Sequence, residues 1–143
     1  MKNKNLVFLF CLFVLFACHE ENESEENPTS CEQVTILNSE LYLSAPSDEL
    51  TINSLEIDGD CLKINFSSSG CSGNSWELKL IDSEDVMESD PSQRNLRLSL
   101  KNEEMCEAYI TKELTFDISN LRVGGSRVKL NLTNSNKYIL YEY

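Results

Sequence analysis

The chain has 143 residues, of which 12 are Lys or Arg and 24 are Asp or Glu, so its net charge is −12 at pH 7. A protein this acidic lacks the basic surface that nucleic acid requires, and no nucleic-acid partner is expected. The length suits one domain built around a single apolar core, preceded by a short amino-terminal extension.

The first residues have the pattern of a secretory signal. Two lysines precede the apolar run LVFLFCLFVLFA at residues 6–17. This run is too short for a membrane-spanning helix, which needs about 20 apolar residues. The run ends in LFAC at residues 15–18, which resembles a bacterial lipobox. The resemblance implies that residues 1–17 are cleaved and that Cys18 carries lipid; a short uncleaved anchor is the alternative.

An acidic segment follows, HEENESEEN at residues 19–27, with five glutamates and no apolar side chain. Such a segment cannot offset the entropy cost of ordering, so residues 18–30 are predicted to form a disordered tether. The segment also looks like the acidic stretch that follows the lipidated cysteine in surface-exported lipoproteins of Bacteroidota. We therefore expect attachment to the outer membrane, facing the cell exterior, with a periplasm-facing orientation as the alternative.

Four cysteines lie beyond the tether: Cys31, Cys61, Cys71 and Cys106. Export to an oxidising compartment favours two disulfides, although four cysteines allow three pairings that the sequence does not distinguish. We favour Cys31–Cys61 and Cys71–Cys106, each closing a loop of about 30–35 residues that contributes roughly 3 kcal/mol. No metal or other cofactor is expected, because the cysteines form no C-x-x-C pair and the domain contains no histidine.

Apolar and polar residues alternate with a period of two in several segments of the domain. Clear alternation occurs at residues 62–66, 76–80, 96–100, 114–118 and 128–132, and weaker candidates are 34–37, 41–43, 51–57 and 138–143. One polar face on each strand favours antiparallel sheets. We predict an all-β fold for residues 31–143, an antiparallel two-sheet sandwich that is Ig-like in the broad sense; a small β-barrel is the alternative.

Polar segments rich in Gly or Ser separate these strands, and we expect turns or loops at residues 57–61, 67–75, 82–93 and 123–126. Gly59 is free to take a positive φ in the first of these, which has the sequence of a hairpin. The connection at 82–93 is expected to contain one helical turn at 83–88. The apolar spacing at 50–57 jumps by three residues, which predicts a β-bulge near Asn53-Ser54.

The domain contains no recognisable catalytic constellation. The only histidine, His19, lies in the tether, so neither a Ser-His-Asp nor a Cys-His arrangement can form. Carboxylates could pair as in a glycosidase, but in an acidic β domain we expect them on solvated faces. Asp58 and Asp60 flank Gly59 without the pattern of an EF-hand loop, so we expect turn chemistry there and not calcium binding.

Three aromatic residues are candidate ligand contacts: Trp76, Tyr141 and Tyr143. Trp76 follows the Ser/Gly-rich loop and suits either core packing beside a disulfide or a stacking platform for a sugar ring. On the predicted terminal strand, Tyr141 and Tyr143 share one face and Tyr138 lies on the other. One face is expected to pack inward and its opposite to present ring surface to a partner.

The stretches DCLKINFSSSGCSGNSWELKLID (60–82), ESDPSQRNLRLSLKNEEMCEA (88–108) and TKELTFDISNL (111–121) look like small lipoproteins of flavobacteria and their relatives. The resemblance implies a surface address and brings no catalytic or binding residue. We therefore expect a non-enzymatic, lipid-anchored envelope protein that displays a β-sandwich as a binding or structural accessory module.

The first alternative is an inhibitor of an extracellular hydrolase, followed by a glycan-binding module or a small hydrolase. The partner would be a protein or a glycan. The candidate contact regions are the loops at 67–75 and 82–93, since loops on a rigid sandwich commonly bear binding function.

The lipid anchor gives the first testable prediction. The wild-type chain should incorporate a labelled fatty acid in living cells, whereas Cys18→Ser should abolish the label. Cys11→Ser is the matched control and should retain the label, because this cysteine lies in the segment that is removed. A wild-type chain without label, or a mature protein that starts elsewhere than Cys18, would contradict the prediction.

Overall fold

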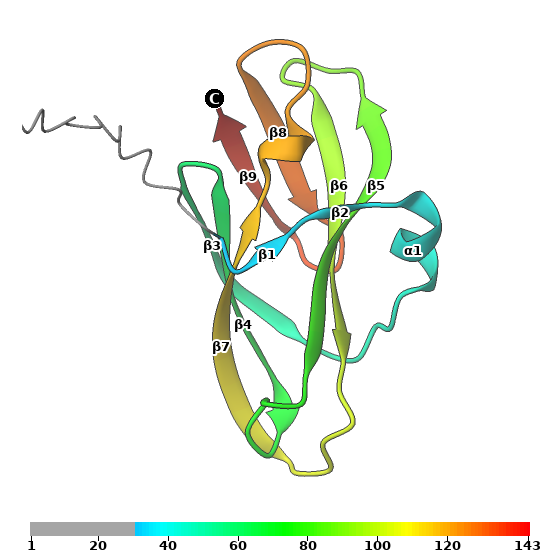
Figure 1. The fold of residues 1–143 in the computed structure, drawn as a ribbon, viewed down its shortest axis with the longest axis vertical. Helices are drawn as coiled ribbons and strands as arrows, with labels where there is room; N and C mark the ends of the chain where they lie inside the picture. The colour runs from blue at the N-terminus through cyan, green and yellow to red at the C-terminus, as the bar shows by residue number, and fades with distance from the viewer. Residues whose placement is uncertain (1–30) are drawn as a thin grey trace, which may run out of the picture.

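The computed structural model describes residues 31–143, so the signal segment, Cys18 and the acidic tether lie outside the described residues. The described chain folds into two β-sheets with one short α-helix (Figure 1). The elements in chain order are β1 (Gln33–Val34), β2 (Ile36–Leu37), α1 (Ser39–Ser44), β3 (Thr51–Asp58), β4 (Cys61–Gly70), β5 (Glu77–Met87), β6 (Gln93–Lys101), β7 (Ala108–Asp117), the 3-10 turn η1 (Ser119–Leu121), β8 (Arg127–Leu132) and β9 (Lys137–Glu142).

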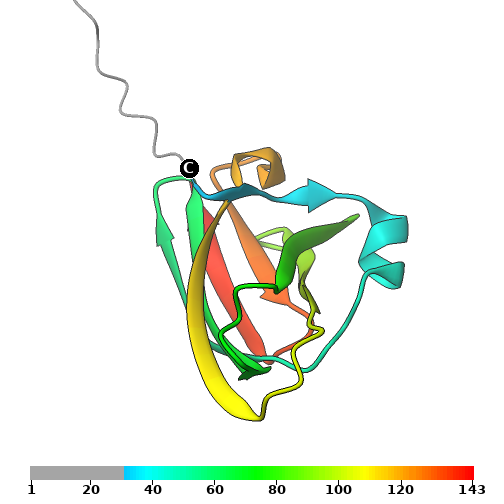
Figure 2. The same ribbon diagram turned by 60° about the horizontal axis from the view of Figure 1, so that its bottom comes forward.

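The strands form a two-sheet sandwich that is not closed into a barrel. The first sheet has the order β1-β7-β4-β3 and the second has the order β2-β5-β6-β8-β9. The short strands β1 and β2 follow each other in the chain and pair with β7 and β5, so this segment crosses from the edge of one sheet to the edge of the other (Figure 2). No helix among residues 31–143 is long and apolar enough to cross a membrane.

The sheets are mixed and not purely antiparallel, which corrects one part of the predicted fold. β1–β7, β2–β5 and β6–β8 pair in parallel. The chain leaves β6 for β7 in the opposite sheet and returns through η1 to β8, so β8 runs in the same direction as β6. A parallel pair needs such a long crossover, and local alternation cannot reveal it.

The apolar faces of both sheets meet in a single core. Leu62, Ile64 and Phe66 of β4 face inward from the first sheet, and the side chains opposite them include Leu96 and Leu98 of β6. All five side chains are almost completely inaccessible to solvent. Over residues 62–66 of β4 and 94–98 of β6, alternation buries every second residue and leaves the residues between them less buried, on the outer side of the sheet.

All five clearly alternating segments are confirmed as strands except for two end residues, since Trp76 precedes β5 and Ile118 follows β7; residues 51–57 and 138–143 also lie largely in strands. Residues 41–43, which we expected to be a weak strand, belong to helix α1 instead. Asn38 caps this helix, since its side-chain oxygen accepts a hydrogen bond from the Leu41 N–H at 2.7 Å. This cap provides a local alternative to strand pairing for a segment whose period-two alternation is weak.

The hairpin and the bulge are confirmed. Asp58 pairs with Cys61, which leaves Gly59 and Asp60 as a two-residue turn, and Gly59 has a φ of 57°. The pairing register of β3 with β4 shifts between Ile52 and Ser54, as the jump in apolar spacing predicted. A positive φ suits glycine because it has no Cβ to clash with the backbone.

The Ser-rich segment 67–75 is only partly a loop, because β4 continues through its first four residues to Gly70. Ser67 and Ser68 are buried, and their hydroxyls are satisfied within the protein. The Ser68 hydroxyl donates to the Glu49 carbonyl oxygen at 2.6 Å, and the Ser67 and Thr111 hydroxyls lie 2.8 Å apart. Small polar side chains whose hydroxyl groups find such partners can be buried in a strand at little cost in free energy.

The expected helical turn at 83–88 is also wrong, because β5 continues to Met87 across a shift in its register with β6. The cause is a buried ion pair at the start of this region. Arg94 donates from Nε and Nη2 to the Asp82 carboxylate at 3.0 and 2.7 Å, and both residues are buried. Asp82 also accepts from the Glu84 N–H at 2.7 Å, and Glu84 has a positive φ of 66°, so the backbone turns locally at the register shift before β5 pairs with β6 again at Val86.

The buried pair gives a stability prediction. Arg94→Leu should lower the free energy of unfolding by about 3–5 kcal/mol, because it leaves the Asp82 carboxylate buried without its cation. The control is Arg127→Leu, whose exposed pair with Asp90 at 3.5 Å should contribute only about 0–1 kcal/mol. Urea denaturation of both variants measures the difference, and equal costs would contradict the assignment.

Candidate functional site

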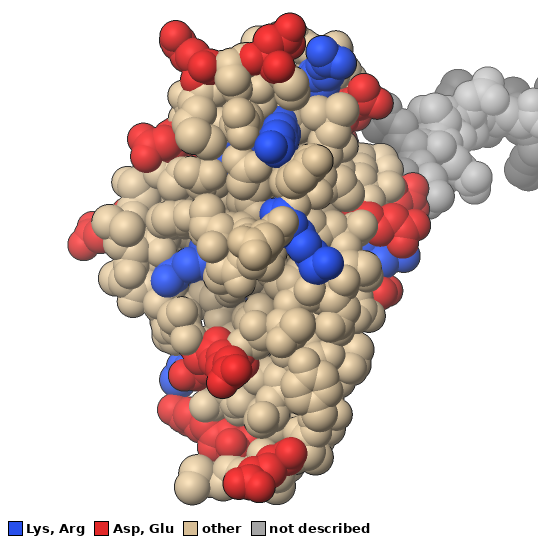
Figure 3. All heavy atoms as spheres, turned by 180° about the vertical axis from the view of Figure 1, so that it is seen from behind, with Lys and Arg blue, Asp and Glu red and all other residues tan. Residues whose placement is uncertain are grey.

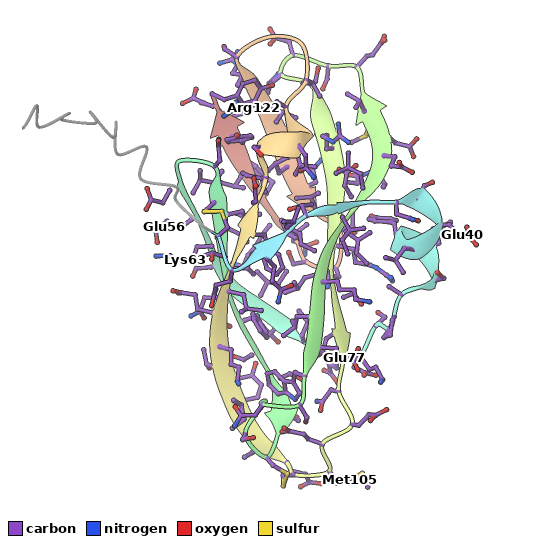
Figure 4. The ribbon with its side chains drawn as sticks, in the orientation of Figure 1. Glu40, Glu56, Lys63, Glu77, Met105 and Arg122 are labelled. Carbon is purple, nitrogen blue, oxygen red and sulfur yellow. A yellow bond between two sulfur atoms is a disulfide. The ribbon has the colours of Figure 1, made fainter. Side chains whose placement is uncertain are left out.

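Two disulfides link distant parts of the described chain, and they are the two pairs that we favoured from the sequence. Cys31–Cys61 ties the start of the domain to the first residue of β4. Cys71–Cys106 joins the loop after β4 to the loop after β6. We call the loops at residues 71–75 and 102–107 the disulfide tip; they form the lower end of the domain, where Met105 is labelled in Figure 4.

A single carboxylate organises the disulfide tip. The backbone N–H groups of Cys71, Ser72 and Gly73 donate to Glu104 Oε2 at 2.5, 2.9 and 2.9 Å, and the Ser75 hydroxyl donates to Glu104 Oε1 at 2.9 Å. The N–H donors of Gly73 and Ser72, in that order, lower the pKa of Glu104 to about 2. The first loop is therefore wrapped around an ionised side chain supplied by the second loop.

Trp76 closes the inner side of the same tip and does not form a platform for ligands. Its side chain is buried, and its ring centroid lies 6.2 Å from that of Phe66 in the core. Two glycines make room for this arrangement. A Cβ on Gly70 would lie 2.9 Å from the Trp76 ring, and Gly73 has a φ of 67° that other residues rarely adopt. Trp76 therefore packs in the core beside a disulfide, which is the first of the two roles that we considered from its sequence.

The outer surface of the disulfide tip combines an apolar apex with acidic flanks. Met105 is 94% exposed, and Glu103 and Glu107 beside it are also exposed. Next to the tip lies an open hollow of about 310 Å³, where Tyr109 forms one wall; its other lining residues are Asp48, Glu49, Leu50, Thr51, Ser67, Ser68, Ser69 and Asn102. The tip and the hollow form one continuous region at this end of the domain.

The two other predicted contacts, Tyr141 and Tyr143, face inward and stabilise the opposite end of the sandwich. Tyr141 is completely buried, and its hydroxyl donates to Asp60, which also accepts from Arg122 Nη2 at 2.6 Å. Burial raises the pKa of Tyr141 to about 12, and the hydrogen bond from Tyr141 is the main cause that lowers the pKa of Asp60. The half-buried Tyr143 donates to the carbonyl oxygen of Val123 at 3.0 Å.

Asp60 is thus a structural residue of the hairpin, in agreement with the expected turn chemistry. Within residues 31–143, no group of three or more His, Cys, Asp or Glu side chains is placed to hold a metal ion. The aromatic residue of β9 that does face solvent is Tyr138, which is 64% exposed and lies on the opposite face of the strand from Tyr141.

Sequence reasoning missed Glu104 and Met105, the two residues that define the tip. Glu104 stands beside Glu103 in the segment NEEMCE, and nothing local distinguishes the glutamate that binds backbone N–H groups from the one that points outward. The proximity of both residues to Cys106 was the available signal, because a disulfide to Cys71 brings this segment against the Ser/Gly-rich loop.

No family model matches the chain, and no curated protein matches it. Solved structures from Bacteroidota are similar to it in fold. They include a DUF1344 protein of unknown function from Bacteroides vulgatus (17% identity, TM-score 0.53), a putative toxin-related protein from Parabacteroides distasonis (16%, 0.52) and a NigD-like immunity protein from Bacteroides caccae (10%, 0.51).

The alignments cover 78%, 78% and 76% of this chain but only 56%, 60% and 59% of those chains, respectively. This chain therefore matches somewhat more than half of each of those proteins. At such low identities the likeness establishes the fold alone, a two-sheet β-sandwich that is also found among proteins of Bacteroidota.

The cradle around Glu104 predicts a specific pH dependence of stability. Because the pKa of Glu104 falls from 4.5 to about 2 on folding, its contribution is fully present above about pH 4.5 and is lost as the pH falls towards 2. Glu104→Gln should lower the melting temperature at neutral pH. It should also reduce the fall in melting temperature between about pH 4.5 and pH 2. Glu103→Gln is the matched control, and identical pH profiles for the wild type and Glu104→Gln would contradict the prediction.

Proposed function

We propose that this chain is a non-enzymatic envelope protein, anchored through lipid on Cys18, whose β-sandwich binds a partner with the disulfide tip. The observation that carries this proposal is the preorganisation of the tip. The Cys71–Cys106 bond joins its two loops, and Glu104 accepts hydrogen bonds from three consecutive backbone N–H groups. Loops that are already ordered lose little conformational entropy on binding, which favours affinity.

The chemistry of the tip suits a basic protein surface. Methionine and tyrosine are enriched at protein interfaces, and Met105 and Tyr109 are exposed by 94% and 65%. Acidic side chains surround them, and Figure 3 shows Asp and Glu gathered towards the lower end of the domain. Opposite charge on a partner would speed the encounter and select against acidic surfaces.

The placement of the tip supports a role in display. β4 begins at Cys61, which is bonded to Cys31 at the start of the domain, and ends at Gly70 beside the tip. A strand of ten residues spans about 33 Å. The point where the tether would join the domain and the tip therefore lie at opposite ends of β4, so the tip would project away from the membrane, on the cell exterior in our proposal.

A second candidate function is inhibition of an extracellular hydrolase, and the shape of the tip favours it. A rigid loop with an exposed apolar apex is suited to entering the cleft of an enzyme and resisting rearrangement there. The likeness to structures named as toxin-related and as a NigD-like immunity protein is compatible with an inhibitory role. Inhibition would then be the consequence of the same contact through Met105.

Site-specific crosslinking in cells tests the proposed contact. A photo-crosslinking residue at position 105 of the full-length chain should capture a discrete protein partner. The matched control is position 43 on α1, where Leu43 is also an exposed apolar residue, at 80%. Capture at both positions alike, or none at position 105, would count against the tip as the contact surface.

The same experiment separates simple binding from inhibition. If the captured partner is a hydrolase, the purified full-length protein should inhibit it, and Met105→Glu should relieve that inhibition without lowering the melting temperature. A captured partner whose activity is unchanged by the protein would favour the accessory binding role over the inhibitor role.

A further inference from the structure

We propose a second binding surface that is independent of the disulfide tip and recognises an acidic polysaccharide, that is, one whose sugars carry carboxylates. The surface is the outward side of β6, β8 and β9. We call it the amide face and define it by Gln93, Asn95, Lys129, Asn131 and Tyr138.

The strand register places these five side chains side by side. In the parallel pair β6–β8, Gln93 lies opposite Lys129 and Asn95 lies opposite Asn131. In the antiparallel pair β8–β9, Asn131 lies opposite Tyr138. The intervening residues of β6 and β8 are buried, so the alternation of each strand turns the amide face outward.

The amides form a row with hydrogen-bonding capacity to spare. Asn131 Nδ2 donates to Gln93 Oε1 at 3.2 Å and to Asn95 Oδ1 at 3.4 Å. Each side-chain amide has two N–H donors and an oxygen that accepts up to two hydrogen bonds. These internal bonds use both N–H groups of Asn131, and Gln93 Nε2 also donates to the Ser89 hydroxyl at 3.0 Å. The row is thereby oriented, and the remaining N–H groups of Gln93 and Asn95 and the spare lone pairs of the amide oxygens are left for the hydroxyl groups of a ligand.

Tyrosine rings with cations beside them lie at both ends of the row. Lys129 Nζ lies 4.1 Å from the centroid of the exposed Tyr138 ring. On the other side, Arg97 of β6 lies 5.8 Å from the ring of Tyr42 in α1. Neighbouring strands are about 4.8 Å apart, so the three strands β6, β8 and β9 present a flat platform about 10 Å across.

These features favour a polysaccharide over a protein. A sugar offers hydroxyl groups to the amides and an apolar C–H face to the tyrosine ring. The large apolar side chains that border the amide face, Leu140 and Met87, are each only about 40% exposed, whereas the centre of a protein interface is markedly apolar. The amide face lacks the exposed apolar apex that Met105 gives to the tip.

Charge complementarity selects an acidic polysaccharide. Figure 3 shows Lys and Arg side chains in the middle of the rear face of the domain, with Asp and Glu towards its outline and lower end. The net charge of the chain is −12, but at physiological salt its field is screened beyond about 8 Å. Arg97 Nη2 already donates to the Ala45 carbonyl oxygen at 2.9 Å, so Lys129 is the cation of the amide face that a bound carboxylate would meet.

Binding of the full-length protein to polygalacturonate, measured by affinity electrophoresis, tests this inference. Tyr138→Ala should weaken binding about tenfold through loss of the ring surface. Tyr109→Ala is the matched control and should have no effect, since it removes an equally exposed tyrosine from the other sheet. Lys129→Gln should weaken binding and flatten its salt dependence, whereas Lys63→Gln on the other sheet should change neither.

The inference would be overturned by absence of binding to polygalacturonate, by equal binding of neutral dextran, or by equal loss in Tyr138→Ala and Tyr109→Ala. Binding of poly-glutamate as tight as that of polygalacturonate, with the same variants affected, would also overturn it, because the amide face would then recognise acidic polypeptide. The crosslinking result at position 105 does not depend on any of these outcomes, since the tip and the amide face share no residue.

Discussion

The packing of two apolar sheet faces into one interior is the constraint on which the rest of the structure depends. Leu62 and Ile64 of one sheet and Leu96 and Leu98 of the other are almost completely buried in this shared core. Because side chains alternate along a strand, burying one set fixes the outward direction of the other. The amide face and the ends of the strands, where the tip forms, are positioned as a consequence of this packing.

The charged groups at the two ends of the sandwich are ordered by partners and not by burial alone. At one end, the Glu104 carboxylate holds the tip loops through backbone N–H groups. At the other end, Asp60 accepts from Tyr141 and Arg122 and secures the hairpin that carries Cys61. The length of β4 separates these two ends, so a contact at the tip and attachment at the tether would not compete for space.

The local pattern was a good guide to the strands and a poor guide to their ends and partners. Alternation located the strands, and the jump at Asn53-Ser54 located the bulge. Alternation did not predict that β5 continues through 83–87, because this polar stretch is anchored by the buried Asp82–Arg94 pair, which joins residues 12 positions apart. Alternation also did not reveal that β6 and β8 pair in parallel, because this pairing depends on a crossover through the other sheet.

The sequence by itself determined which residues are apolar at every second position, and therefore the strands and much of the core, because this property depends on neighbours along the chain. It also placed Tyr138 and Tyr141 on opposite faces of one strand. Only the tertiary structure decided that Tyr141 is the buried one, that Glu104 and not Glu103 holds the tip, and that three amides from two strands form a row. These outcomes depend on contacts between segments far apart in the chain, which no local pattern encodes.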